Sequence, residues 1–215
     1  MKFKFLLLAF TGLLLQMSVT AQEGWTLKKD KNGIKVFSRK SDIYKFDQLK
    51  VECEFEGRMS QLAAVLLDVN NQSQWVYKTH KSQLLKENSS SEVLYYTEID
   101  CPWPFENRDM VIHMSIAQNT ENKVMTIIAK SINDYLEDKP NLVRIKYSSA
   151  LWTVTPIDKD HFKIEYTIQV DPGNGIPAWL LNLFAINGPY ESFFNLKKKI
   201  KLPQYAQVKF PFILE

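Results

Sequence analysis

Alternating apolar and polar positions run through most of this chain and predict a protein rich in β-strands. The clearest case is 50–56, where Val51, Cys53 and Phe55 point to one side and the glutamates between them to the other. A strand of this kind has one buried face and one wet face, as in antiparallel sheets. Similar patterns predict further strands at 33–37, 93–99, 108–117, 124–129, 142–154 and 161–170.

Short polar turns connect several of these segments. The turn at 119–122 joins two of the expected strands, and the turn at 156–160 joins the last two. Because such connections are too short for a crossover, we expect the strands to be antiparallel neighbours.

Two segments have apolar residues at helical spacing instead. The first follows Ser60, a candidate N-cap, and ends near 70–71. The second runs from about Pro177 to Lys199, and Pro189 is expected to kink or divide it. About 23 residues of helix span roughly 35 Å, which is enough to cross a sheet. The pattern predicts an α+β fold in which a curved antiparallel sheet encloses a cavity beneath a long C-terminal helix.

The first 21 residues have the layout of a secretory signal peptide. Lys2 and Lys4 precede an apolar run at 5–15, and small residues lead to Ala21. This run is shorter than the roughly 20 residues that a membrane-spanning helix needs. We expect cleavage after Ala21, export to the periplasm or the extracellular space, and one domain at 22–215. An uncleaved N-terminal anchor is the alternative.

Charge and cysteine content add little beyond this. The 27 Lys and Arg residues fall to 25 without Lys2 and Lys4, against 24 Asp and Glu, so the net charge of the expected mature chain is +1. That balance gives no electrostatic case for nucleic acid. The lysines at 197–199 suit a helix C-terminus, or a weak, transient contact with anionic membranes. Export permits a disulfide between Cys53 and Cys101, but the sequence does not show whether they meet.

The most informative chemistry lies where a proline-bounded loop enters the strand at 108–117. Arg108, Met110, Ile112 and Met114 share the more apolar face, which should be the inner one. A buried arginine needs a carboxylate, a run of carbonyl groups or an anionic ligand group. Its planar fork suits phosphate or carboxylate, so Arg108 is a candidate polar anchor for a ligand. An ion pair with Glu98, Asp100 or Asp109 is the structural alternative, and core packing is the alternative for the methionines.

Catalysis has no comparable signal. No two of the three histidines have metal-ligand spacing, and no nucleophile elbow or phosphate loop is present. We therefore expect no enzyme, no metal and no cofactor. If the cavity were catalytic, Arg108, Tyr147, Tyr166 and Glu98 would be the first polar groups to test. An extracytoplasmic protein-interaction module is the third class of function.

Several motifs occur in an order that is similar to one known family. The segment 102–111, PWPFENRDMV, resembles the proline-rich loop and Arg-Asp strand of the START family (steroidogenic acute regulatory protein-related lipid-transfer domains). The segments at 68–75, 139–144, 152–156 and 171–182 also resemble family motifs, the last with the pattern Asp-Pro-x-Gly-x-Ile-Pro-x-Trp-Leu-x-Asn. Together these segments are distributed over nearly all of the expected mature chain.

This resemblance implies a helix-grip fold with a lipid-sized tunnel and a monomer that binds a lipid or another hydrophobic small molecule. The ligand-binding residues would be Arg108, Met110, Ile112, Met114, Trp103, Tyr147, Tyr166, Trp179, Leu183 and Phe184. The C-terminal helix would act as the gate. The sequence departs from the family where Val76 follows Trp75, and where the tight turn at 119–122 leaves 131–141 as the candidate lid.

Overall fold

The computed structural model describes residues 24–41, 46–173 and 175–215. The expected signal peptide at 1–21 lies outside these residues. Among the helices in the described part of the chain, none is both long enough and apolar enough to cross a bilayer.

The strands and helices of the described chain follow the α+β pattern that the sequence predicts. The strands are β1 (Thr26–Lys31), β2 (Ile34–Arg39), β3 (Gln48–Glu56), β4 (Thr79–Ser89), β5 (Glu92–Ile99), β6 (Asn107–Gln118), β7 (Met125–Ile132), β8 (Leu142–Arg144), β9 (Tyr147–Asp158) and β10 (His161–Asp171). The helices are α1 (Met59–Leu67) and α2 (Ala178–Lys199), with short 3-10 segments η1 (Val69–Gln74) and η2 (Pro203–Tyr205).

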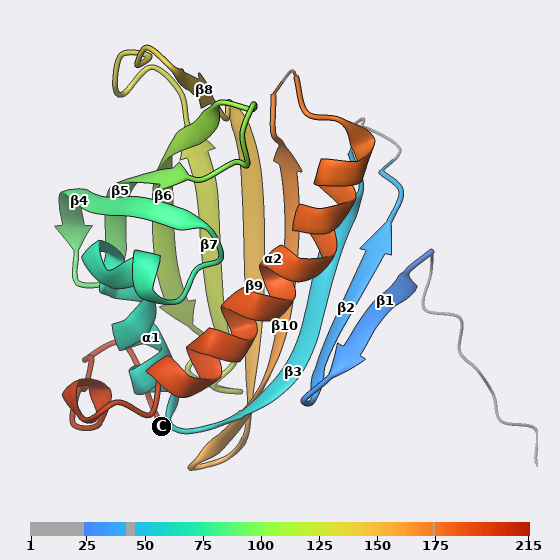
Figure 1. Cartoon of the computed structure of the whole chain (residues 1–215). Helices are drawn as coiled ribbons and strands as arrows, with labels where there is room; N and C mark the ends of the chain where they lie inside the picture. The colour runs from blue at the N-terminus through green and yellow to red at the C-terminus, as the bar shows by residue number, and fades with distance from the viewer. Residues whose placement is uncertain (1–23, 42–45, 174) are drawn as a thin grey trace, which may run out of the picture.

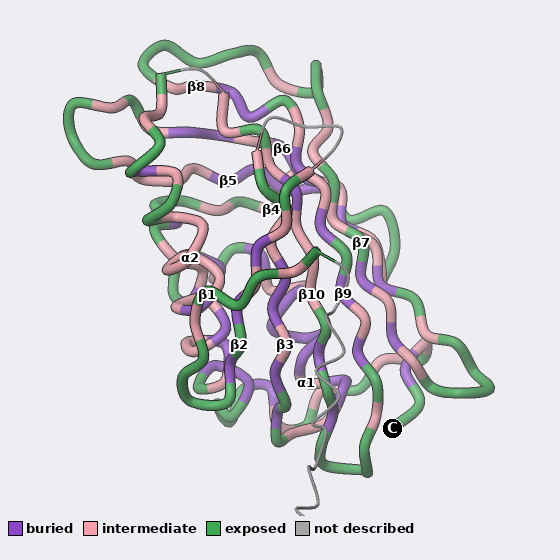
Figure 2. Tube along the Cα trace, turned by 90° about the vertical axis from the view of Figure 1, so that its right-hand side faces the viewer, coloured by how far each residue is buried: buried purple, intermediate pink, exposed green. Residues whose placement is uncertain are grey.

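All ten strands form one sheet, in the order β1-β2-β3-β10-β9-β7-β6-β5-β4, with β8 beside β6. The sheet curls around α2, which runs obliquely across its concave face (Figure 1). Buried positions alternate with more exposed ones along the strands (Figure 2), as the sequence pattern predicts. On β3, for example, Val51, Cys53 and Phe55 are buried while Glu54 and Glu56 are exposed. The helix-grip arrangement expected from the sequence is confirmed.

The two edge strands, β1 and β4, were not predicted. Most of their residues are exposed, so neither segment shows an alternation of apolar and polar side chains. Lysines at 28, 29 and 31 occupy β1, and β4 pairs with β5 through several register shifts. Charged residues and irregular pairing are common at sheet edges because they discourage pairing with another chain.

The expected strand at 142–154 is instead two strands. The chain breaks after Arg144, and the two parts join different neighbours: β8 pairs with β6 in parallel, while β9 pairs with β7 in antiparallel register. The expectation of purely antiparallel neighbours is therefore wrong for β8. The following turn is also tighter than predicted, because β9 continues to Asp158 and Pro156 lies within it.

Helix α1 starts two residues before the position expected from the sequence. Arg58 is its N-cap and Ser60 lies inside the helix, where its hydroxyl is buried without a hydrogen-bond partner. The free backbone N–H groups of Met59 and Ser60 instead donate to the side-chain carboxylate of Glu215, at 3.1 and 3.2 Å. A distant residue has taken the capping role, which no local pattern could reveal.

Helix α2 is continuous over 22 residues, so Pro189 does not divide it. Pro177 is the N-cap rather than part of the first turn. Near the proline, the hydroxyl of Ser192 donates to the carbonyl of Gly188 at 2.7 Å and accepts the N–H of Tyr77 at 3.0 Å. These contacts tie the helix near Pro189 to the segment that follows η1.

Both faces of the sheet are covered where β5 meets β6. Besides the main core on the concave side, a smaller cluster of Leu94, Tyr96 and Val111 is buried on the outer side, packed against Leu136. The segment at 133–141 supplies this cover. Both faces of β6 are therefore buried at this end.

A buried ion pair holds the covering segment to the sheet. The Asp109 carboxylate accepts Nε and Nη2 of Arg144 at 2.8 and 3.0 Å, and the Tyr96 hydroxyl at 3.0 Å. Arg144 also donates to the carbonyls of Leu136 and Glu137, at 3.0 and 3.1 Å. Side-chain exposure is 5% for Arg144 and 1% for Asp109. One guanidinium therefore joins β6, β8 and the loop between β7 and β8.

Replacing Arg144 should measure how much its ion pair with Asp109 stabilises the fold. Arg144→Met leaves Asp109 buried without its cation, so the free energy of unfolding should fall by roughly 3–5 kcal/mol. Lys139→Met is the control, because Lys139 lies 3.3 Å from Glu98 in the same region but is 42% exposed. That exposed pair should contribute at most about 1 kcal/mol. Urea unfolding checks both variants, and similar losses would contradict the role given to Arg144.

Candidate functional site

The side chains of β6 that the sequence assigns to the inner face do lie on that face. Ile112 and Met114 are buried in the main core, and Met110 packs against that core half-buried. Phe193 of α2 belongs to the same core, so this row faces the side of the sheet that the helix covers. Arg108 begins the row and is only 3% exposed.

Arg108 hydrogen-bonds to backbone carbonyl groups from two segments. Its Nη1 donates to the carbonyl of Glu106, and its Nε lies 3.5 Å from the carbonyl oxygen of Pro172. It also hydrogen-bonds to the thiol of Cys101, although burial is the larger influence and raises the pKa of that thiol. Asp109, one of the expected ion partners, binds Arg144 instead. Arg108 therefore links the loop at 101–106 to the turn that precedes α2.

Apolar side chains from the same two segments are exposed at this end of the molecule. Trp103, Trp179 and Leu183 are 92%, 59% and 42% exposed. The Phe105 ring meets Trp179 edge-on at 6.3 Å, which brings the loop at 101–106 against the start of α2. Figure 1 shows this end at the top, where the turn after β10 and strand β8 also lie.

The turn before α2 packs closely against β8. Gly173 has a φ of +79°, and a Cβ added there would lie 3.0 Å from a methyl group of Val143. Glycine alone adopts this conformation without strain, and here it also permits the close approach. Strand β8 thus contacts this turn through Val143. In the parallel pairing of β8 with β6, Val143 is also the partner of Arg108.

Two more of the expected residues lie on the concave side. Phe184 meets the ring of Tyr77 edge-on at 5.7 Å, and both lie near the junction of η1 with α2. Tyr166 packs against Trp152 at 4.6 Å and Phe193 at 5.3 Å. Burial raises the pKa of the Tyr166 hydroxyl well above its usual range, so this group stays neutral.

Several concave-side residues were not predicted as part of the site. Tyr95 lies on β5, and burial raises the pKa of its hydroxyl to about 12, although a hydrogen bond from Gln72 opposes that shift. Trp75, which follows η1, has a buried indole N–H with no hydrogen-bond partner. The alternation of Val93 and Tyr95 could have placed Tyr95 on the inner face, whereas the positions of Gln72 and Trp75 depend on tertiary packing.

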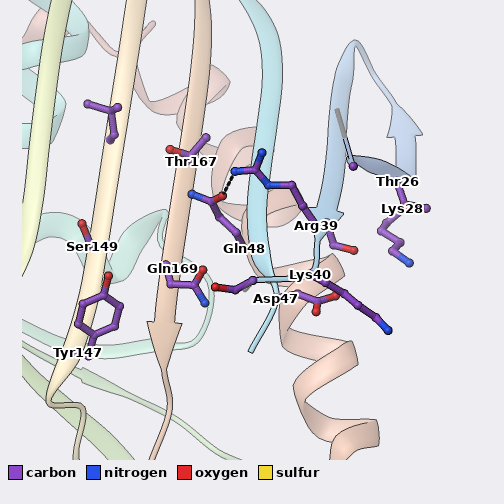
Figure 3. A pocket seen from close by; sticks show the side chains of 14 residues that line it. Thr26, Lys28, Arg39, Lys40, Asp47, Gln48, Tyr147, Ser149, Thr167 and Gln169 are labelled. Carbon is purple, nitrogen blue, oxygen red and sulfur yellow. Dashed lines mark hydrogen bonds between the residues drawn. The ribbon is translucent and has the colours of Figure 1, made fainter. Parts of the chain in front are cut away.

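Tyr147 was expected to be a ligand-binding residue, but it lies on the outer face of the sheet, away from the concave side. Its neighbour Ser148 is buried with Ala150 and Trp152, so the period of two along β9 turns Tyr147 outward. There it lines a pocket of about 1020 Å³ between β1–β3 and β9–β10 (Figure 3). Much of this pocket is polar, including Arg39, which donates to Gln48 at 2.7 Å.

The outer pocket and the concave face differ in character. Lys28, Arg39, Lys40 and Asp47 line the outer pocket, together with several hydroxyl and amide side chains. Sites for apolar ligands have mainly hydrophobic and aromatic walls with a few polar groups. The concave face is closer to that description in its side chains, since Met110, Ile112, Trp152 and Phe193 lie on it with Arg108 and Tyr166 as polar groups.

Each of the three histidines lies beside a single carboxylate. His113 lies 2.6 Å from Glu92, and His161 lies 3.0 Å from Asp158, in both cases on the surface. No cluster of three or more His, Cys, Asp or Glu side chains occurs among the described residues. Both cysteines are free thiols, with Cys53 buried and Cys101 partly exposed. The candidate site on the concave face consists of apolar side chains and isolated polar groups.

Comparison with known proteins agrees with this fold. A STAR-related lipid transfer protein fragment from Xanthomonas axonopodis is 29% identical, with a TM-score of 0.77, and the match covers 84% of this chain and all of that one. Human phosphatidylcholine transfer protein is 25% identical over 181 residues, which is 81% of this chain and 82% of the relative. The aromatase/cyclase Zhui of Streptomyces sp. R1128 is 12% identical with a TM-score of 0.52 and matches 72% of this chain and 93% of its own, so the likeness concerns the fold alone.

A family model identifies the chain more directly. The START domain model matches residues 8–202, which is most of the sequence. The order of the sequence motifs, the sheet wrapped around α2 and the similar lipid-transfer proteins all agree with that match. The chain belongs to the START domain family.

Proposed function

We propose that this protein carries one lipid, or a similar hydrophobic molecule, between its curved sheet and α2. The observation that carries the proposal is an apolar inner surface that is not fully packed. Met110, Tyr166, Ile168 and Phe184 all face inward but are only half-buried. Native cores pack closely, so apolar inner side chains with residual exposure favour a space that a ligand can fill. The similar proteins named for lipid or phosphatidylcholine transfer support the same class of ligand.

The ligand would enter at the end where Trp103, Trp179 and Leu183 are exposed. These three side chains, which we call the apolar rim, lie on the loop at 101–106 and the first part of α2. Aromatic side chains with one polar group suit the boundary between lipid and water. In this proposal the first part of α2 moves as the gate, and the apolar rim makes a transient contact with a membrane while the lipid is exchanged.

Arg108 is the proposed polar anchor at that entrance. It lies on the inner face, beside Met110, and its guanidinium already bridges the two segments that border the apolar rim. A phosphate or carboxylate would be recognised by its planar fork. Arg108 would then hold the polar end of the lipid near the gate while the chains extend along the inner row of β6.

The protein would act as an exported monomer, in the periplasm or outside the cell. The support for export is the charged, apolar and small-residue pattern of the first 21 residues. A small carrier of this kind would need no partner to shield its ligand if the sheet and α2 enclosed that ligand.

Loading is the direct test of the carrier proposal. The protein should be purified from its own host and examined by native mass spectrometry, with extraction and identification of any bound lipid. We expect one lipid per chain, and uptake of lipid by the emptied protein from mixed liposomes. Protein that is consistently empty and takes up nothing would overturn the proposal.

Removing the Arg108 charge should weaken loading. Arg108→Met keeps a similar length and apolar character, and the loss of a charge-assisted contact should reduce uptake of an anionic lipid such as phosphatidic acid roughly tenfold. Arg108→Lys keeps the charge but not the fork, so it should retain an intermediate level. Circular dichroism and thermal unfolding confirm that each variant folds. Unchanged loading by a folded Arg108→Met protein would rule out the anchor.

The apolar rim can be tested separately. Trp103→Ser with Trp179→Ser should reduce co-sedimentation with phospholipid vesicles and slow lipid transfer at least several-fold, because two exposed aromatic groups no longer enter the interface. Ile157→Ser is the matched control, since Ile157 is 55% exposed near the turn between β9 and β10, at the other end of the sheet. Equal effects of the control and the double variant would contradict a specific rim.

A further inference from the structure

The outer face of the sheet has a pocket that the proposed lipid carriage does not involve. This pocket of about 1020 Å³ extends over β1, β2, β3, β10 and β9, which are consecutive in the sheet (Figure 3). Its volume is comparable to that of sites for small molecules, which is roughly 300–1,000 Å³. Because α2 lies on the concave face, the sheet separates this pocket from the proposed lipid site.

One side of the pocket carries an excess of positive charge. Lys28, Arg39 and Lys40 line it, and Asp47 supplies the one carboxylate among the described lining residues. Figure 3 shows these four side chains on the side of β1 and β2. Three cations and one anion leave two positive charges in excess, and a recess lined by one sign of charge concentrates ligands of the other sign. The charge of this pocket therefore favours an anion.

Arg39 is already positioned to bind such an anion. Its guanidinium carbon lies 4.6 Å from the centroid of the Trp25 ring, and its Nη2 donates to Oε1 of Gln48 at 2.7 Å. A guanidinium has five N–H donors, and among the described residues this hydrogen bond uses one of them. The donors that remain belong to a planar fork whose geometry matches phosphate or carboxylate.

Neutral hydrogen-bonding side chains line the other side of the pocket. Thr167 and Gln169 lie on β10, and Ser149 on β9 is the cross-strand partner of Gln169. Gln169 is only 7% exposed, and its amide nitrogen donates to the carbonyl of Phe46 at 2.6 Å. The side-chain oxygen of Gln169 accepts no hydrogen bond from the described residues, and the amide N–H groups of Gln48 donate none to them. These groups can bond to the hydroxyl groups of a ligand.

We infer that the outer pocket binds a small hydroxylated anion, a phosphate or carboxylate with neighbouring hydroxyl groups. Its anionic group would bind the fork of Arg39, while Lys28 and Lys40 add attraction at longer range. Its hydroxyl groups would bond to Thr167 and Gln169 on the opposite side. This inference goes beyond the carrier proposal and does not depend on it. The same chemistry occurs in a free sugar phosphate and in the glycerol phosphate headgroup of phosphatidylglycerol, and the experiment below separates these sources.

The first test compares two soluble probes that differ by one phosphate. Isothermal titration calorimetry should show that the wild-type protein binds glucose 6-phosphate at least roughly tenfold more tightly than glucose, because charge-assisted hydrogen bonds are the stronger ones. Arg39→Gln should weaken glucose 6-phosphate binding by roughly tenfold. Thr167→Val keeps every charge and removes one hydroxyl, so it should weaken binding by roughly two- to fivefold.

Lys163→Gln is the matched control for the loss of charge. Lys163 is exposed on the same face of β10 as Thr167 but does not line the pocket, so this variant should bind as the wild type does. Thermal unfolding checks that each variant folds. If Arg39→Gln does not fold, the result for Thr167→Val decides. Unchanged binding in that variant then overturns the site.

The second test asks whether the anion is carried by a lipid. Co-sedimentation is measured with vesicles of phosphatidylcholine alone and of phosphatidylcholine and phosphatidylglycerol in equal parts. Weaker binding of Arg39→Gln to the mixed vesicles only, with Lys163→Gln unaffected, supports a lipid headgroup as the ligand. Arg39-dependent binding of glucose 6-phosphate without that difference supports a free one.

Three results overturn the inference. They are the absence of Arg39-dependent binding in both tests, equal losses in Arg39→Gln and Lys163→Gln, and wild-type binding of glucose as tight as that of glucose 6-phosphate. Uptake of phosphatidylcholine into the protein should be the same in all these variants, because the pocket and the lipid site lie on opposite faces. The carrier proposal is therefore judged separately, by that uptake.

Discussion

The packing of one phenylalanine fixes how the helix and the sheet fit together. Phe193 stacks on Trp152 at 4.9 Å and meets the rings of Tyr166 and Phe55 at 5.3 and 6.4 Å. Those three rings come from β9, β10 and β3, which are consecutive in the sheet. Aromatic pairs of this kind add about 0.5–1.5 kcal/mol each to the benefit of burial. For three strands to meet around one ring the sheet must curl, and the concave face follows from that curvature.

The same alternation that builds the core also separates two adjacent charges. Arg108 and Asp109 are neighbours in the chain but point to opposite faces of β6. Asp109 faces outward, where Arg144 neutralises it beneath the 133–141 segment. Arg108 faces inward and hydrogen-bonds to carbonyl groups of the loop at 101–106 and of the turn before α2. The pairing on the outer side thus leaves the inner cation to join these two segments, while residues 133–141 of the candidate lid at 131–141 pack as a cover on the outer face.

Local periodicity predicted the parts of the fold that have one buried and one exposed face. The inner row of β6, the faces of β3 and the long C-terminal helix follow directly from it. The edge strands β1 and β4 were not predicted because few of their side chains are buried. Tyr147 lies on the outer face instead of at the expected site because the break after Arg144 changes which positions of β9 face inward. The position of Gln72 needed tertiary information, because Gln72 lies in a short 3-10 segment that only folding brings to Tyr95 on β5. Capping of α1 by Glu215 joins residues more than 150 positions apart, beyond any motif.

The two halves of α2 differ in how many of their side chains are buried, and this bears on the gate proposed for the helix. Before Pro189 only Leu180 is buried, whereas Tyr190, Phe193, Leu196 and Lys199 are buried after it. Proline has no N–H, so the helix already lacks one hydrogen bond at the junction. Local unfolding of the first half should therefore cost less than that of the second half, as the gate proposed for it would require. Backbone amides at 181–187 should exchange with solvent well before those at 193–199, and a bound lipid should narrow that difference by giving the first half something to pack against.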